Sequence, residues 1–436
     1  MSGSTYPLVN STDPNLLVGW VPEDTNRGTW SLISSCFFTI LICTWTAIHP
    51  RVHVSRRIRH AHKFYQLVKA ILAPEMVCLE SLQEFLQARK AVRRCAKATN
   101  GEFRTVHGFY LCMMGVRYND GDSGGYRTLW PGQYAWLLNN GLVSWDNHKI
   151  WGLSREDIED KNKADGFVKV AALLQVIWFT LQCIVRSVNH LPLATLETMT
   201  LAYVFNALVT YAFWWEKPKD IATAAFVDLP EMTPLQREKF ENLAMEDTYD
   251  VSDPNQKQSN AIAWYVVPRD CRDDEVLVMG QEEHEMNEPY SSSRDGTNST
   301  KDLIVSQAEE AKVITKWDAS LYMTRYWPLL WLLGASFGAI HLISWVSVFP
   351  SEVELWLWRV SALISVVTAV LCMQFRTMRF TWEGPLTIIK IGSPFLYLVS
   401  RVIMAVETFA GLRAMEASTY EIVSLSNYWF HFRNLF

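Results

Sequence analysis

The residues of this sequence best suited to chemistry are polar or ionisable side chains within long apolar stretches. Such side chains are costly in an apolar setting, so they usually line a site or pair with one another. If each stretch is placed across a membrane, most of these side chains fall at one depth, near the external interface. They are Arg186, Asn189, His190, Glu197, His341, Arg401 and Glu407.

We predict an acid/base role for Glu197 and His341, because carboxylate and imidazole groups commonly transfer protons. The residues predicted to bind the polar part of a substrate are Arg186, His190, Asn206, Arg401 and Glu407. A second interpretation remains open, in which the layer is an ion-paired lock that only holds the helices together. Asn206 lies mid-span, where a hydrogen bond between helices is the alternative to substrate binding.

Known catalytic and metal-binding signatures are otherwise missing from the sequence. It contains no GxSxG, P-loop, HExxH or GxGxxG motif, and its eight cysteines form no CxxC pair. Neither a metal site nor a cofactor is therefore predicted. The acidic run Asp273-Asp274-Glu275 is interpreted as solvated charge.

The elements that must position these residues are six apolar stretches. Of 436 residues, 49% are hydrophobic and 19% are charged, against roughly 25% charged in an average soluble protein. About 20 apolar residues are needed to cross a bilayer. The stretches of about that length are Trp30–Ile48, Gly166–Val185, Leu193–Trp215, Trp327–Ser347, Leu355–Phe375 and Pro385–Phe409. The sequence therefore predicts an all-α, polytopic helical membrane protein with about six transmembrane helices.

Basic residues near the first stretch predict the orientation. Arg51, Arg56, Arg57, Arg59 and Lys63 follow it without an acidic residue among them, which places that side in the cytosol. The N-terminus would then be external or lumenal, and the N-glycosylation sequon at Asn10 could be modified, whereas the sequon at Asn298 could not. Lys217 and Lys219 are interpreted as cytosolic anchors after the third stretch.

The segment Phe64–Leu86 has apolar residues at helical spacing but also carries charges and Pro74. We interpret it as an amphipathic helix, kinked at Pro74, that lies at the cytosolic face. The alternative is a seventh span, which would invert the topology after it.

These elements divide the chain into seven parts. They are an external segment (1–29), the first span (30–48), a cytosolic amphipathic helix with a small subdomain (49–165), a hairpin of two spans (166–215), an acidic cytosolic loop (216–326), three further spans (327–409) and a tail (410–436). Within the acidic loop we expect a helix at Thr233–Met245, a strand at Ala261–Val267 and disorder at Gln281–Lys301.

Several segments resemble a widespread group of fungal multi-pass membrane proteins without an assigned activity, some of which carry a "transcription factor domain" label. The resembling segments include Leu72-Ala-Pro-Glu75, Leu191-Pro-Leu-Ala-Thr-Leu-Glu197, Trp214-Trp-Glu-Lys-Pro-Lys-Asp220 and Gly338-Ala-Ile-His341. The chain departs from the family pattern around Cys112. The resemblance implies a fungal source, a membrane setting and, more distantly, a place in secondary metabolism.

Two classes of function remain open on the sequence. One is a membrane enzyme that acts by proton transfer on a lipophilic substrate, such as an isoprenoid. The other is a transporter or ligand sensor that uses the same polar layer, and a membrane scaffold is a third possibility. The expected partners are the lipid bilayer and a lipophilic small molecule, in the endoplasmic reticulum or another endomembrane rather than the plasma membrane. The formal net charge of −5 excludes a strongly basic nucleic-acid binder.

Overall fold

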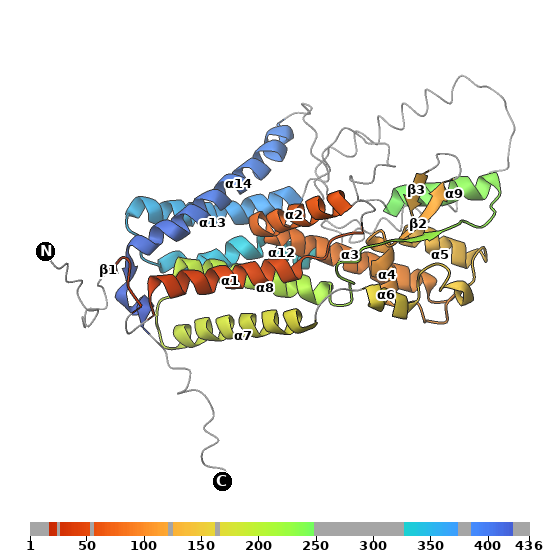
Figure 1. Cartoon of the computed structure of the whole chain (residues 1–436). Coiled ribbons are helices and arrows are strands. Elements are labelled where there is room, and N and C mark those ends of the chain that lie inside the picture. The colour runs from red at the N-terminus through yellow and green to blue at the C-terminus, as the bar shows by residue number, and fades with distance from the viewer. Residues whose placement is uncertain are drawn as a thin grey trace, which may run out of the picture.

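The protein is mostly helical, with a bundle of long helices at one end and a small mixed subdomain at the other (Figure 1). The computed structural model describes residues 17–23, 27–52, 56–120, 125–161, 166–247, 327–373 and 385–421. The sequons at Asn10 and Asn298, the acidic run at 273–275, the expected strand at 261–267 and the segment 281–301 lie outside these residues.

All six apolar stretches are helical. They correspond to α1 (Thr29–Ala47), α7 (Gly166–Val188), α8 (Thr195–Phe213), α12 (Trp327–His341) extended by the 3-10 turn η4 (Leu342–Val346), α13 (Glu352–Met373) and α14 (Leu386–Ala410). Consecutive helices of this set alternate in direction (Figure 1). Among the described residues, five segments are long and apolar enough to cross a membrane: Thr29–Ala47, Val170–Val188, Pro328–Val346, Glu352–Cys372 and Ile391–Arg413.

Helix α8 is the expected span that does not meet this criterion. It lies among α1, α3, α7, α12 and α14, and its buried residues include Thr195, Glu197, Thr198, Thr200 and Asn206. A helix inside a bundle contacts other helices rather than lipid, so it does not need an apolar surface on every face. The peripheral helices α7 and α14 instead expose apolar side chains along their length.

The predicted amphipathic surface helix is corrected by the structure. Two helices replace it, α2 (Arg56–Leu72) and α3 (Pro74–Cys95), and they pack against each other as a hairpin. Pro74 does not kink one helix but begins the second, where its missing N–H needs no partner. The tip of the hairpin, around Ala73, reaches the middle of α8, because Tyr203 Oη donates to Ile71 O at 2.5 Å.

The base of the hairpin is fixed by buried charges. Lys217 Nζ lies 2.5 Å from Glu84 Oε2, and these side chains are only 1% and 3% exposed. Arg51 Nε lies 3.5 Å from the other oxygen of Glu84. Lys219 Nζ donates to Thr46 O at 3.0 Å, at the end of α1 where carbonyls lack helical partners. Lys217 and Lys219 therefore make internal contacts with α3 and α1, which the sequence did not predict.

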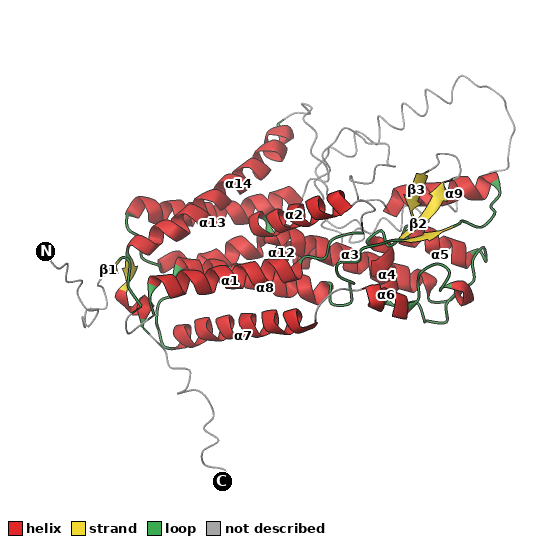
Figure 2. Ribbon diagram, in the orientation of Figure 1, coloured by secondary structure: helices red, strands yellow, loops and turns green. Residues whose placement is uncertain are grey.

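The subdomain corrects the all-α prediction, because it contains a three-stranded sheet (Figure 2). Strand β2 (Val116–Asp120) is antiparallel to β3 (Gly125–Thr128) and parallel to β4 (Ala225–Val227). The helices around it are α4 (Thr105–Cys112), α5 (Pro131–Asn139), α6 (Arg155–Lys161) and α9 (Pro234–Asp247), with the 3-10 turn η1 (Trp145–Asn147). Helix α9 confirms the helix expected at 233–245, whereas β4 was not expected. Helix α3 joins the bundle to this subdomain, since it packs against α8 and α12 as well as α4 and α5.

A second, smaller sheet joins the two ends of the described chain. Strand β1 (Leu17–Val18) pairs with β5 (Met415–Glu416), between the turns η5 (Gly411–Arg413) and η6 (Ala417–Tyr420). Tyr420 Oη also lies 2.9 Å from Thr29 Oγ1. The N-terminal and C-terminal segments thus meet at the end of the bundle opposite the subdomain.

Candidate functional site

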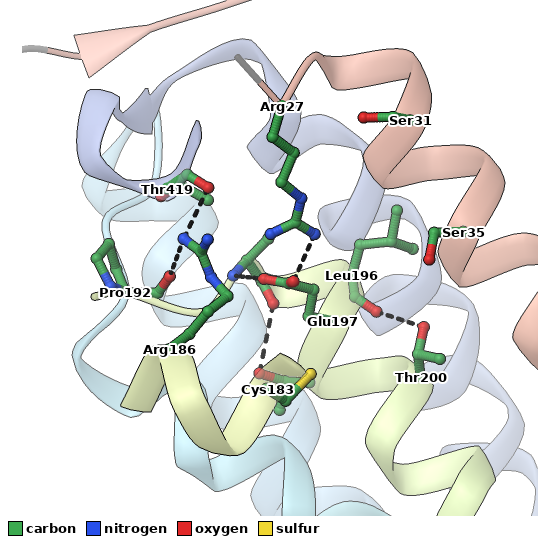
Figure 3. Close-up of polar contacts among 12 residues, drawn as sticks. Arg27, Ser31, Ser35, Cys183, Arg186, Pro192, Leu196, Glu197, Thr200 and Thr419 are labelled. Carbon is green, nitrogen blue, oxygen red and sulfur yellow. Dashed lines mark hydrogen bonds and ion pairs between the residues drawn. The ribbon is translucent and has the colours of Figure 1, made fainter. Parts of the chain in front are cut away.

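The polar residues predicted to share one layer fall into two separate groups. Glu197 and Arg186 belong to an outer group at the end where β1 and β5 lie (Figure 3). His341 and Arg401 belong to an inner group around the tip of the α2–α3 hairpin. Asn206 lies on the α8–α12 contact, and His190 is exposed in the turn between α7 and α8.

Glu197 has its hydrogen-bonding capacity taken up by structural contacts. Its Oε2 accepts from the backbone N–H of Ala194 at 3.0 Å, so it caps the first turn of α8. Its Oε1 accepts from Arg27 Nη2 at 2.5 Å. Figure 3 shows Arg27 reaching from the start of α1 to this carboxylate. A carboxylate engaged on both oxygens is poorly placed to accept a proton from a substrate.

Arg186 holds the C-terminal segment to the bundle. Its Nη1 donates to Glu421 O at 2.9 Å, and its Nη2 donates to Thr419 O at 2.7 Å, with Pro192 O and Ser418 O slightly farther away. Figure 3 shows the guanidinium turned toward Pro192 and Thr419. The outer group therefore holds the segment before α1 and the C-terminal segment to this end of the bundle. Glu407 is buried at the same end, near Glu354 and Arg413.

Asn206 also serves helix packing. Its Oδ1 accepts from Ser336 Oγ of α12 at 3.1 Å, and its Nδ2 donates to Ala202 O. A second bond to α8 comes from η4, the turn that extends α12, where Ser344 Oγ donates to Thr198 Oγ1 at 2.7 Å. These bonds satisfy the hydroxyl and amide groups inside an otherwise apolar contact.

The inner group begins at the backbone of the hairpin tip. Arg401 Nε donates to Leu72 O at 3.0 Å, and Tyr203 Oη donates to the neighbouring carbonyl of Ile71. The chain between α2 and α3 is not helical at Ala73, so these carbonyls have no helical partners. Non-helical backbone within a membrane requires protein partners of this kind.

Glu75 is a site residue that was not predicted from the sequence. It is fully buried, and its Oε1 accepts from Tyr397 Oη at 2.5 Å. A signal was present in the sequence, because Glu75 falls at helical spacing with Leu79 and Leu82, on the apolar face of α3. A carboxylate on the apolar face of a helix is expensive unless it has a partner or a function.

His341 and Arg401 both contact one aromatic ring, that of Phe337. The Arg401 guanidinium carbon is 3.3 Å from the centre of the Phe337 ring, and the His341 ring centre is 4.5 Å from it. His341 Nδ1 lies 2.7 Å from Phe337 O. Because a carbonyl can only accept, Nδ1 carries the hydrogen, and Nε2 of the neutral ring is left as an acceptor.

Three atoms of the inner group are buried without a partner. Among the described residues, nothing forms a hydrogen bond to Glu75 Oε2, Arg401 Nη1 or His341 Nε2. Glu75 and His341 are fully buried and Arg401 is 7% exposed. Buried polar atoms are nearly always paired in folded proteins, so three such atoms in one group require an explanation. We name Glu75, His341, Tyr397 and Arg401 the inner cluster.

The inner cluster has the composition for proton transfer and for binding an oxygen atom. Across the described ranges, no three His, Cys, Asp or Glu side chains gather as metal ligands would. A carboxylate and an imidazole can exchange protons with a bound molecule, and a guanidinium can hold an oxygen atom as charge develops on it.

Comparison with known proteins gives one match. Residues 5–111 and 141–237, just under half of the chain, match the model of a family of unknown function (DUF8562). Neither a curated protein nor a solved structure matches the chain. The matched residues include Glu75 but not His341, Tyr397 or Arg401, which lie beyond residue 237. This chain is thus similar, over its N-terminal part, to a family that has no assigned activity.

Proposed function

We propose that the protein is a multi-pass membrane protein in which α1, α7, α8, α12, α13 and α14 cross the bilayer. The apolar length of five helices supports this, and α8 is added because it lies inside the bundle they form. Both ends of the described chain lie at the end opposite the subdomain, as an even number of crossings requires. Basic residues of α2 and α3 at the subdomain end, among them Arg57, Arg59, Arg89 and Arg93, favour a cytosolic subdomain.

Within this setting the inner cluster acts as an acid/base site on a lipophilic molecule. Glu75 and His341 transfer protons, Arg401 binds the oxygen on which negative charge develops, and Tyr397 positions Glu75. The single observation that carries the proposal is that three unpartnered buried polar atoms belong to residues of one cluster, contributed by three different helices. A purely structural network would be expected to pair these atoms with one another.

A second candidate function is transport of the same molecule. The observation that favours it is the hairpin tip at mid-length of α8, because broken or re-entrant helices often form substrate sites in transporters. The two functions share the ligand site and differ in whether the ligand is changed.

The test is expression in a heterologous yeast, with metabolite profiling of cells and medium. Wild type is compared with Glu75→Gln and with His341→Phe, which keeps an aromatic ring beside Phe337 and Trp358 but cannot accept a proton. The matched control is Glu159→Gln, which changes an exposed carboxylate of α6. We expect a new lipophilic product in wild type and control that is lost in both cluster variants while the proteins remain folded.

Two outcomes would assign the function differently. Loss of the product in Glu197→Gln, with Glu75→Gln active, would return the acid/base role to the outer group. An unchanged set of metabolites, together with altered uptake or export that depends on Glu75, would favour transport and refute the enzyme.

A further inference from the structure

The three unpartnered atoms of the inner cluster define what a ligand must offer. Arg401 Nη1 is a donor and needs an acceptor, such as a carbonyl oxygen. His341 Nε2 is an acceptor, because Nδ1 is bound to Phe337 O, and it needs a donor. The second oxygen of Glu75, whose first oxygen accepts from Tyr397, also accepts when the carboxyl group is ionised.

The charges of the inner cluster restrict the ligand further. One guanidinium and one carboxyl group lie close enough to interact electrostatically, and a neutral ligand adds no charge to this buried cluster. An amine would place a second positive charge beside Arg401, and a carboxylate would place a negative charge beside Glu75. Each added charge is expensive where water is excluded.

We propose that the inner cluster binds a neutral amphiphile whose head carries a carbonyl oxygen and a neighbouring hydroxyl group. The carbonyl accepts from Arg401 Nη1, and the hydroxyl donates to His341 Nε2 or to Glu75 Oε2. This inference rests on the proposed function, since it names the substrate class of the same site. It excludes alkyl amines, fatty acid anions and plain hydrocarbons as ligands.

The inner cluster lies close to the surface of the bundle, at the tip of the hairpin. Leu72 is 43% exposed although its carbonyl accepts from Arg401, so an apolar ligand would reach the cluster from the bilayer at this point. Helix α14 packs mainly along α13, and its start diverges from the bundle (Figure 1). Its outward residues, including Phe395 and Leu398, are apolar and exposed. An apolar tail can remain beside these residues while the head reaches Arg401.

Purified full-length protein in dodecyl maltoside provides a direct test, with thermal unfolding followed by tryptophan fluorescence. The probes are 1-hydroxydodecan-2-one, dodecan-2-one, dodecylamine and dodecanoate. We expect a saturable rise in Tm of roughly 2–5 °C with the hydroxyketone near 100-fold excess over Kd. A smaller rise is expected with the plain ketone, and none with the amine or the carboxylate.

Two variants connect this effect to the cluster. His341→Phe and Arg401→Lys should each weaken hydroxyketone binding by about 10- to 100-fold, because each loses one hydrogen bond to the ligand. Because Arg401→Lys also alters a contact of the hairpin tip, His341→Phe keeps the test valid if the arginine variant does not fold. The exposed carboxylate variant Glu159→Gln should bind as wild type does.

The results separate this inference from the proposed function. Stabilisation by dodecylamine or dodecanoate in place of the hydroxyketone, or by none of the probes, would overturn the ligand class. So would hydroxyketone binding that His341→Phe and Arg401→Lys leave unchanged. Saturable hydroxyketone binding without a new product in yeast would leave the ligand class standing and refute the enzyme.

Discussion

The buried pair at the base of the α2–α3 hairpin allows a quantitative prediction. Glu84→Gln leaves the Lys217 ammonium buried at 1% exposure, with the Trp214 ring 4.0 Å from Nζ. Removing one partner of a buried ion pair costs about 3–5 kcal/mol. Lys217→Met should cost less, about 1.5–3 kcal/mol, because Glu84 keeps Arg51.

The double variant Glu84→Gln/Lys217→Met should be more stable than Glu84→Gln alone. The main penalty in the single variant is the uncompensated charge of Lys217, and the second substitution removes that charge. We expect a favourable coupling of about 1–2 kcal/mol between the two substitutions. The assay is unfolding in mixed micelles with increasing SDS, followed by tryptophan fluorescence.

The pH dependence gives a second readout of the same pair. Burial lowers the pKa of Lys217 below its usual range, while Glu84 opposes this effect. The unfolded chain therefore binds more protons than the folded chain below the ordinary lysine pKa, so stability increases as the pH rises toward it. Without Glu84 the pKa of Lys217 is lowered further. The difference in stability between wild type and Glu84→Gln should therefore shrink between pH 7 and pH 9.

The control for this prediction is Glu159→Gln, which removes a partner of Arg155 at a pair that is 56% exposed on both sides. We expect no measurable change there, since surface pairs contribute little. Three results together would refute the reasoning. The two single variants would lose equal stability, their effects would add in the double variant, and the stability deficit of Glu84→Gln would not vary with pH.

Three further predictions concern other parts of the chain. Burial, together with the nearby His148, lowers the pKa of His107 to about 4. The free energy of unfolding should therefore fall by up to about 3 kcal/mol as the pH drops from 6.5 to 4. In His107→Gln, the Tm measured by thermal unfolding should vary less over this pH range. Arg186→Lys should release the C-terminal segment and speed its cleavage in limited proteolysis, because lysine cannot reach several carbonyls with a planar fork. Glycosidase treatment of protein from yeast microsomes should shift wild type but not Asn10→Gln.

Each of these predictions has a contrary outcome. The amide of His107→Gln can still accept from the Arg104 N–H, as the imidazole does. If the pH profile of this variant is unchanged, His107 is not the titrating group. Cleavage of Arg186→Lys at the wild-type rate would mean that the strand pair β1–β5 holds the segment alone. A glycan on Asn298 would overturn the external N-terminus.

The sequence predicted the long helices well, because apolar length is a property of each segment alone. All six apolar stretches are helical, with ends within a few residues of those expected. It also indicated that Asn206 could bond between helices and that the outer polar residues could pair. The hairpin was missed, because the partners of its polar atoms are remote in sequence: Ile71 O is bound by Tyr203, and Leu72 O by Arg401.

The candidate site was predicted only in part for the same reason. Placing residues by depth along separate helices put Glu197 and His341 in one layer, but depth does not tell which way a side chain points. The structure pairs Glu197 with Arg27 and brings Glu75 near Arg401 instead. Glu75 was overlooked because its segment was expected to lie at the surface.

The sequence by itself determined the helical content, the segments apolar enough to cross a membrane and the few ionisable residues within them. Those features depend on local composition and spacing. Tertiary structure alone decided that α8 is central, that Lys217 is buried and that Glu75, Tyr397, Arg401 and His341 meet. Burial and pairing of charges depend on contacts between residues hundreds of positions apart, such as the 322 positions between Glu75 and Tyr397, and no local pattern encodes them.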